Sequence, residues 1–194
     1  EMAFLIYNLV IFPIIAGMLI VNDDFVHFFL GKDFQDARYA IAIMIFRMFF
    51  IGWTNIMGIQ ILIPHNKNKE FMISTTAPAI ISVGLNLLFL PKLGYIGAAI
   101  VSVLTEAIVW GIQLFFARVY LKEVPIIGYM TKIVLASAIM YGILLGSKTF
   151  IHFSPTINVL VFAVLGGIIY LFEILSMKVI DVKELKQIIK NNGV

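Results

Sequence analysis

Six long apolar runs, separated by polar breaks, limit what this 194-residue chain can fold into. A helix that crosses the hydrocarbon core of a membrane needs about 20 mainly apolar residues. The runs that qualify are residues 2–21, 39–63, 71–90, 96–120, 126–146 and 157–177. They lack the strict alternation of apolar and polar residues that is typical of membrane strands. We therefore predict an all-α, polytopic membrane protein with six transmembrane helices.

The composition supports a membrane protein and excludes several soluble classes. Hydrophobic residues make up 61% of the chain and charged residues 13%, whereas soluble domains average about 45–50% and about 25%. A soluble globule of this size could not bury so much apolar surface. The composition excludes a cytosolic enzyme and a nucleic-acid-binding protein, and the lack of cysteine excludes a disulfide scaffold. We recognise no catalytic triad, phosphate-binding loop or metal-ligand spacing, so we predict no catalytic residues, cofactor or metal.

The breaks between the runs predict a simple domain organisation. Most are short and rich in turn residues, which favours antiparallel neighbouring helices and leaves no room for a soluble insert. Residues 1–177 are therefore predicted to form one transmembrane lobe. In residues 178–194, apolar and charged positions recur at helical spacing, which predicts a cytoplasmic amphipathic helix on the membrane surface. The alternative for this tail is a solvated, charged segment.

The distribution of basic residues predicts the orientation. Nine lysine and arginine residues are assigned to one side of the membrane and four to the other, and Arg47 lies within a span. The positive-inside rule places the side with nine in the cytoplasm. Both ends of the chain are then cytoplasmic, and the acidic break 22–38 faces outward. The chain opens inside an apolar run without a signal-peptide pattern, which we interpret as an internal start.

Polar side chains inside the apolar runs are the candidate functional residues. A charge in hydrocarbon costs at least about 2.5–3.5 kcal/mol, so such groups should face protein or water. At helical spacing, polar positions form one line in each of the second, third and fourth runs. We predict that the three lines converge on a shared aqueous cavity. The candidate pathway residues are Arg47, Thr54, Asn55, Asn86, Glu106 and Gln113.

Other roles for these residues are also consistent with the sequence. Serine, threonine and asparagine in membrane helices often only hold helices together. Arg47 and Glu106 lie at similar depths and could form an ion pair. Without a partner, the planar guanidinium of Arg47 would suit a phosphate, and Glu106 could carry a proton.

Three segments carry a resemblance to a known family. They are residues 29–37 (FLGKDFQDA), residues 60–64 (QILIP) with the basic hairpin that follows, and residues 86–100 (NLLFLPKLGYIGAAI), followed by Glu106. Together they make the region from Pro13 to Tyr120 resemble the carboxy-terminal half of bacterial polysaccharide flippases. These flippases belong to the multidrug/oligosaccharidyl-lipid/polysaccharide transporter superfamily.

The resemblance implies both an architecture and a function. Members of this family have two six-helix lobes around a central cavity, so the chain would supply the second lobe and need an amino-terminal lobe as its partner. The family implies translocation of undecaprenyl-pyrophosphate-linked oligosaccharides across the bacterial cytoplasmic membrane by alternating access, in contact with membrane lipids. The expected function is therefore transport and not catalysis.

Three other functions are consistent with the sequence. The first is a cation-coupled multidrug exporter of the same superfamily. The second is a polytopic membrane enzyme of polysaccharide assembly, which would normally display catalytic residues in a large outer loop. The third is a scaffold subunit whose polar side chains only join helices.

Overall fold

The computed structural model describes residues 1–122, 126–150, 153–177 and 179. Within these ranges all regular structure is helical. The elements are α1 (Met2–Phe29), the short 3-10 helix η1 (Lys32–Phe34), α2 (Ala37–Asn55), the π-helix η2 (Ile56–Leu62), α3 (Asn68–Leu121), α4 (Ile126–Ser147) and α5 (Pro155–Ser176). The predicted surface helix at residues 178–194 lies outside the described residues, apart from residue 179.

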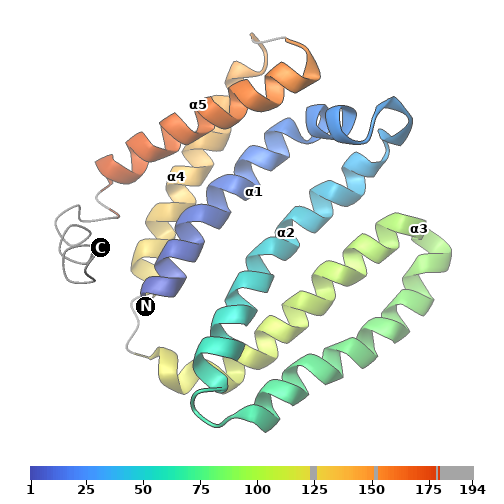
Figure 1. Cartoon of the computed structure of the whole chain (residues 1–194), viewed down its shortest axis with the longest axis vertical. Coiled ribbons are helices and arrows are strands. Elements are labelled where there is room, and N and C mark those ends of the chain that lie inside the picture. The colour runs from blue at the N-terminus through green and yellow to red at the C-terminus, as the bar shows by residue number, and fades with distance from the viewer. Residues whose placement is uncertain (123–125, 151–152, 178, 180–194) are drawn as a thin grey trace.

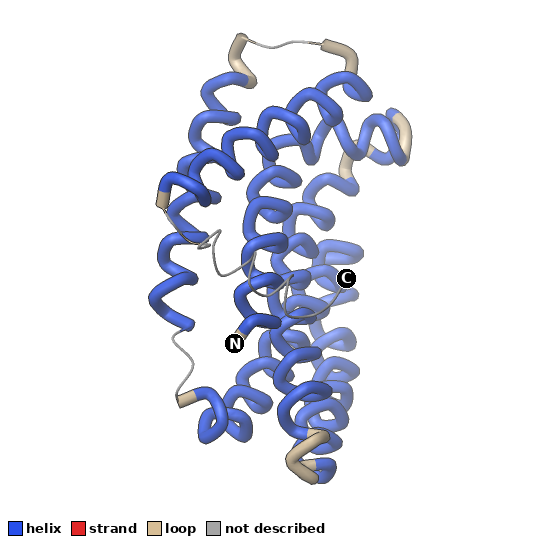
Figure 2. Tube along the Cα trace, turned by 60° about the vertical axis from the view of Figure 1, so that its left-hand side comes forward, coloured by secondary structure: helices blue, strands red, loops and turns tan. Residues whose placement is uncertain are grey.

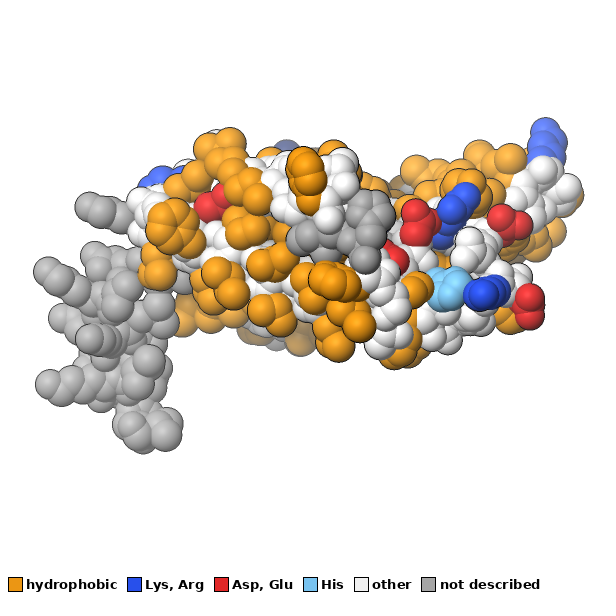
Figure 3. All heavy atoms as spheres, turned by 90° about the horizontal axis from the view of Figure 1, so that it is seen from above, with side chains coloured by type: hydrophobic (Ala, Val, Ile, Leu, Met, Phe, Trp, Pro, Cys, Tyr) orange, Lys and Arg blue, Asp and Glu red, His pale blue; other side chains and the backbone are white. Residues whose placement is uncertain are grey.

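The helices have the length and composition of membrane spans. Five helices in the described part of the chain are long and apolar enough to cross a membrane, α2 being counted together with η2. They lie beside one another in an elongated bundle (Figures 1 and 2). Hydrophobic side chains spread across much of the face in Figure 3, while charged side chains gather toward one end. The predicted class, an all-α polytopic membrane protein, is confirmed.

Helix α3 differs from the prediction of two separate helices. It is one 54-residue element in which only Gly94 leaves the helical backbone, with φ 55° and ψ −136°. The chain turns back at this bend, so that the two arms of α3 lie next to each other (Figure 1). A positive φ favours glycine because it has no Cβ. At Gly97 a Cβ would lie 2.7 Å from the carbonyl oxygen of Phe89, so the bend needs a second glycine.

Helix α1 continues past its predicted span of residues 2–21, so the prediction that a loop begins at Asn22 is wrong. The physical reason is that other segments satisfy the polar side chains that suggested a break. The amide of Asn22 donates to the carbonyl oxygen of Arg38 at 2.8 Å. Asp24 accepts a hydrogen bond of 3.1 Å from Asn158 on α5. With these partners in place, the backbone can stay helical.

Helix α1 lies between two groups of helices, and apolar clusters join it to both. One cluster joins α1 to α4 and α5. The buried side chains of a second cluster come from α1, the π-helix and its neighbours in α2 and α3. Figure 1 shows the same order, with α4 and α5 on one side of α1 and α2 and α3 on the other.

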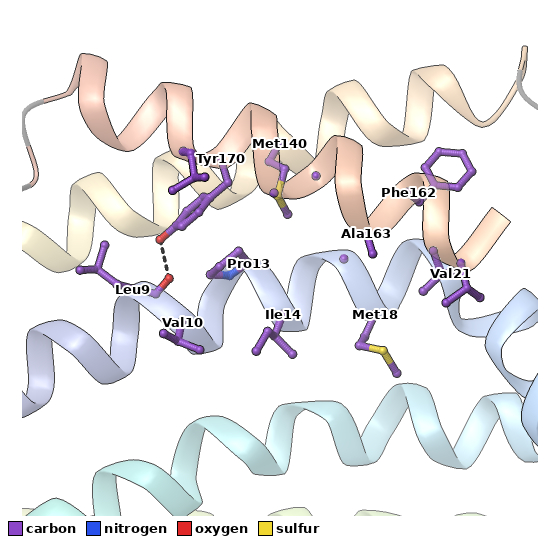
Figure 4. Close-up of a pocket in the computed structure, with 15 residues that line it drawn as sticks. Leu9, Val10, Pro13, Ile14, Met18, Val21, Met140, Phe162, Ala163 and Tyr170 are labelled. Atoms are coloured by element: carbon purple, nitrogen blue, oxygen red, sulfur yellow. Dashed lines mark hydrogen bonds between the residues drawn. The ribbon is translucent and has the colours of Figure 1, made fainter. Parts of the chain in front are cut away.

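Pro13 creates a local defect in α1 that α5 repairs. Proline has no backbone N–H, so the carbonyl of Leu9, four residues earlier, loses its helical partner. The hydroxyl of Tyr170 on α5 donates to this carbonyl oxygen at 2.8 Å (Figure 4). The bond therefore satisfies a backbone group inside the membrane and fixes α5 against α1.

We expect Tyr170→Phe to lower the free energy of unfolding of the full-length protein by about 1–2 kcal/mol, because it leaves the Leu9 carbonyl unpaired. Thermal unfolding of the purified protein in lipid nanodiscs measures this change. Tyr141→Phe is the matched control, since no hydrogen bond of the Tyr141 hydroxyl is seen in the described part of the chain. An equal change in both variants would contradict the role of the Tyr170 hydroxyl.

Candidate functional site

An ion pair links α2 to the second arm of α3. The Nη2 atom of Arg47 lies 2.8 Å from Oε1 of Glu106, and the two side chains are 37% and 19% exposed. This confirms the ion-pair alternative for these two residues. Each charge offsets the other, which lowers the cost of placing them among apolar helices.

A polar cavity of about 300 Å³ lies next to this pair. It is bordered by the end of α2, the π-helix and both arms of α3. Its lining residues are Thr54, Asn55, Ile59, Phe71, Thr75, Ala79, Thr105, Glu106, Val109 and Gln113. Four of the six predicted pathway residues therefore meet at one cavity, namely Thr54, Asn55, Glu106 and Gln113.

Gln113 is the most deeply buried polar residue of the cavity wall. Gln113 is only 1% exposed. Its Nε2 atom donates to the hydroxyl oxygen of Ser74 on the first arm of α3, at 3.3 Å. Its Oε1 atom is buried and has no hydrogen-bond partner among the described residues. Such an unpaired acceptor is costly unless a ligand or water completes it.

Gly58 in the π-helix allows this arrangement. A Cβ at Gly58 would lie 2.6 Å from Cε2 of Phe71 and 3.0 Å from Nε2 of Gln113. The glycine therefore lets both arms of α3 approach the π-helix closely. π-helical turns often occur at functional sites. A single sequence does not reveal this π-helix, since a helical pattern does not distinguish π from α hydrogen bonding.

The remaining two predicted pathway residues do not line the cavity. Arg47 reaches it only through Glu106. Asn86 donates to the carbonyl oxygen of Ser82, one turn earlier in its own helix, at 2.9 Å. Two residues outside the candidate set, Thr75 and Thr105, do line it. The structure thus joins parts of the three predicted polar lines and leaves Asn86 apart.

Two larger hollows in the bundle have almost wholly apolar walls. One, of about 490 Å³, lies between α1, α4 and α5 (Figure 4). The other, of about 460 Å³, is bordered by α1, α2 and α4. Neither holds a charged side chain, so neither can orient a polar ligand as the cavity beside Glu106 can.

No cluster of metal-ligating side chains is found in the described ranges: no three or more histidine, aspartate or glutamate residues come together. The acidic residues at the end of α1 are engaged by other groups instead. Asp24, for example, lies 3.8 Å from the ammonium group of Lys148, in addition to its bond with Asn158.

The fold and the site define a polytopic helical membrane protein with a polar, ion-paired cavity among apolar helices. The sequence is 32% identical over 89 residues, 46% of the chain, to a protein of Escherichia coli (strain K12) described as "Putative O-antigen transporter". The matched part is 21% of that relative, so it spans about a fifth of its length. No family model matches the chain, and no solved structure does.

Proposed function

We propose that this chain is part of a flippase, namely its second lobe, that moves undecaprenyl-pyrophosphate-linked oligosaccharides across the bacterial cytoplasmic membrane. The observation that carries the proposal is the polar cavity beside the Arg47–Glu106 pair, inside a mainly apolar bundle. Ionisable and polar groups at such positions commonly mark substrate pathways. The similarity to a described O-antigen transporter favours a glycan as the cargo.

The topology that we propose gives each arm of α3 one crossing of the membrane. The bend at Gly94 then separates two spans, and the chain crosses six times with both ends in the cytoplasm. A second, amino-terminal lobe would complete the transporter and close the pathway. The bent α3 and the π-helix after α2 are the kind of interrupted helices on which alternating access depends.

The test uses the full-length protein in liposomes that contain a fluorescent, polyprenyl-pyrophosphate-linked oligosaccharide. An added glycosidase reports how much of the sugar reaches the outer surface. We expect the wild type to expose it and the double variant Arg47→Leu/Glu106→Leu to slow exposure at least tenfold, because the cavity wall loses the carboxylate of Glu106 and the guanidinium that balances it. The control variant Arg38→Leu/Asp23→Leu removes an exposed pair that joins the end of α1 to the start of α2, and it should transport normally.

Two outcomes would contradict this function. Cation-dependent efflux of a dye, without movement of the oligosaccharide, would favour the multidrug exporter. A change in the length of the oligosaccharide would favour a membrane enzyme. Normal transport by the Arg47→Leu/Glu106→Leu variant would remove this cavity from the pathway.

A further inference from the structure

The hydroxyl protons of the three threonines in the cavity wall are all donated within the protein. Each of the three hydroxyls donates to a backbone carbonyl of its own helix. The bonds run from Thr54 to Ile51 at 2.9 Å, from Thr75 to Met72 at 3.0 Å and from Thr105 to Val101 at 2.7 Å. A hydroxyl that has donated its one proton can still accept through its oxygen lone pairs. The threonines therefore offer acceptors to a ligand.

The hydrogen bonds around Ser74 fix the orientation of the Gln113 side-chain amide and leave its oxygen without a partner. Ser74 donates its hydroxyl proton to the carbonyl oxygen of Phe71, at 2.6 Å. The oxygen of Ser74 can then only accept, and the atom of Gln113 that faces it must be Nε2. The buried Oε1 atom is left as an unused acceptor.

The carboxylate of Glu106 adds further acceptors without adding net charge, because Arg47 balances it. Among the described lining residues, free side-chain N–H groups remain only on Asn55 and on Nε2 of Gln113, which donates one of its two hydrogens to Ser74. Beside the wall, Nε of Arg47 is a further buried donor without a partner among the described residues. The wall therefore has few free donors and is rich in oxygen acceptors. A phosphate brings mainly acceptors at its oxygens and would find few partners in this wall.

We infer that this cavity binds the hydroxyl groups of a neutral sugar as hydrogen-bond donors and rejects phosphate. The inference rests on the proposed function, since a lipid-linked oligosaccharide supplies both kinds of group. It assigns the glycan to this cavity and the pyrophosphate to another part of the transporter. The volume of the cavity, about 300 Å³, is at the lower end of the range for small-molecule sites.

The experiment compares three probes on the full-length protein in lipid nanodiscs by saturation-transfer NMR. Maltotriose carries many hydroxyl donors. Fully O-methylated maltotriose keeps the oxygens and has no donor, and inorganic pyrophosphate brings mainly acceptors. We expect maltotriose to bind and the other two to bind at least tenfold more weakly, because a lost hydrogen bond costs roughly a factor of ten.

Variants locate the binding. Gln113→Leu and Thr105→Val should each weaken maltotriose binding by roughly tenfold, since each removes one acceptor. Ser147→Ala is the matched control: Ser147 also donates to its own helix, at 2.8 Å, but lies on α4 outside the cavity. Unfolding temperatures check whether each variant is folded. If Gln113→Leu does not fold, Thr105→Val still tests the inference.

Three results with these probes would overturn the inference, and a fourth result would come from sodium NMR. They are no binding of maltotriose, equal binding of its methylated form, and pyrophosphate binding that Gln113→Leu abolishes. A sodium NMR response that depends on Gln113, without a sugar signal, would assign the cavity to a cation and overturn it as well. The liposome assay separates the two proposals, because translocation without maltotriose binding would retain the flippase and reject only the glycan site.

Discussion

Glu106→Leu alone is expected to lower the free energy of unfolding of the full-length protein by about 3 kcal/mol, because it leaves the charge of Arg47 unpaired among apolar helices. Replacing Arg47 with leucine as well should restore most of this loss. The reason is that two leucines need no partner, whereas one remaining charge does. Denaturation of the two single variants and the double variant, measured in one lipid system, gives the coupling energy between the two sites.

The exposed pair between Arg38 and Asp23 is the control for this cycle. Its atoms are 3.4 Å apart and the side chain of Asp23 is 61% exposed, against 19% for Glu106, so Asp23→Leu should cost less than about 1 kcal/mol. If the losses of the two single variants at Arg47 and Glu106 simply add in the double variant, the pair is not coupled. The ion pair would then not stabilise the bundle.

The second large effect is expected at Gly52, where α2 packs against α1. A Cβ at this position would lie 1.8 Å from the Cζ atom of Tyr7. Gly52→Ala therefore forces the ring of Tyr7 to move, which also breaks the bond from its hydroxyl to the carbonyl oxygen of Met48. We expect a loss of about 2–3 kcal/mol in the free energy of unfolding, measured by thermal denaturation.

Gly17→Ala is the matched control, because nothing lies within 4 Å of a Cβ built at Gly17. In a helix interior this change should be neutral or stabilise by up to about 1 kcal/mol. The double variant Tyr7→Ala/Gly52→Ala should lose less than the sum of its two single changes, since the overlap is gone. Additive losses would show that the ring of Tyr7 is not the obstacle.

The sequence was sufficient to predict the all-α membrane class and some of the residues that border the cavity. The energetic penalty for a charge in hydrocarbon left Arg47 and Glu106 few arrangements, and mutual pairing was one of them. Helical spacing also placed Thr54 and Gln113 on faces that meet at the cavity. These predictions succeeded because they depend on the membrane as solvent and on the period of an α-helix.

Other features depend on partners that are remote in sequence and could not be predicted. The acidic residues at the end of α1 suggested a loop. In the folded protein Asn158 and Lys148 lie beside Asp24, and the sequence alone does not reveal these neighbours. Asn86 shares a helical face with Thr75, yet it bonds to its own backbone, as asparagine can in many helices. The π-helix has no pattern of its own in a single sequence.

The contacts that complete α1 come from the end of the chain, and this has a consequence for biosynthesis. The carbonyl oxygen of Leu9 accepts a hydrogen bond from Tyr170, and the carboxylate of Asp24 contacts Lys148 and Asn158. As chains are made from the amino terminus, α1 must enter the bilayer well before these partners emerge from the ribosome. Until then, its open carbonyl and its acidic end need water, lipid headgroups or an insertion factor. A ribosome stalled before α4 should therefore leave α1 sensitive to proteases or to extraction from the bilayer.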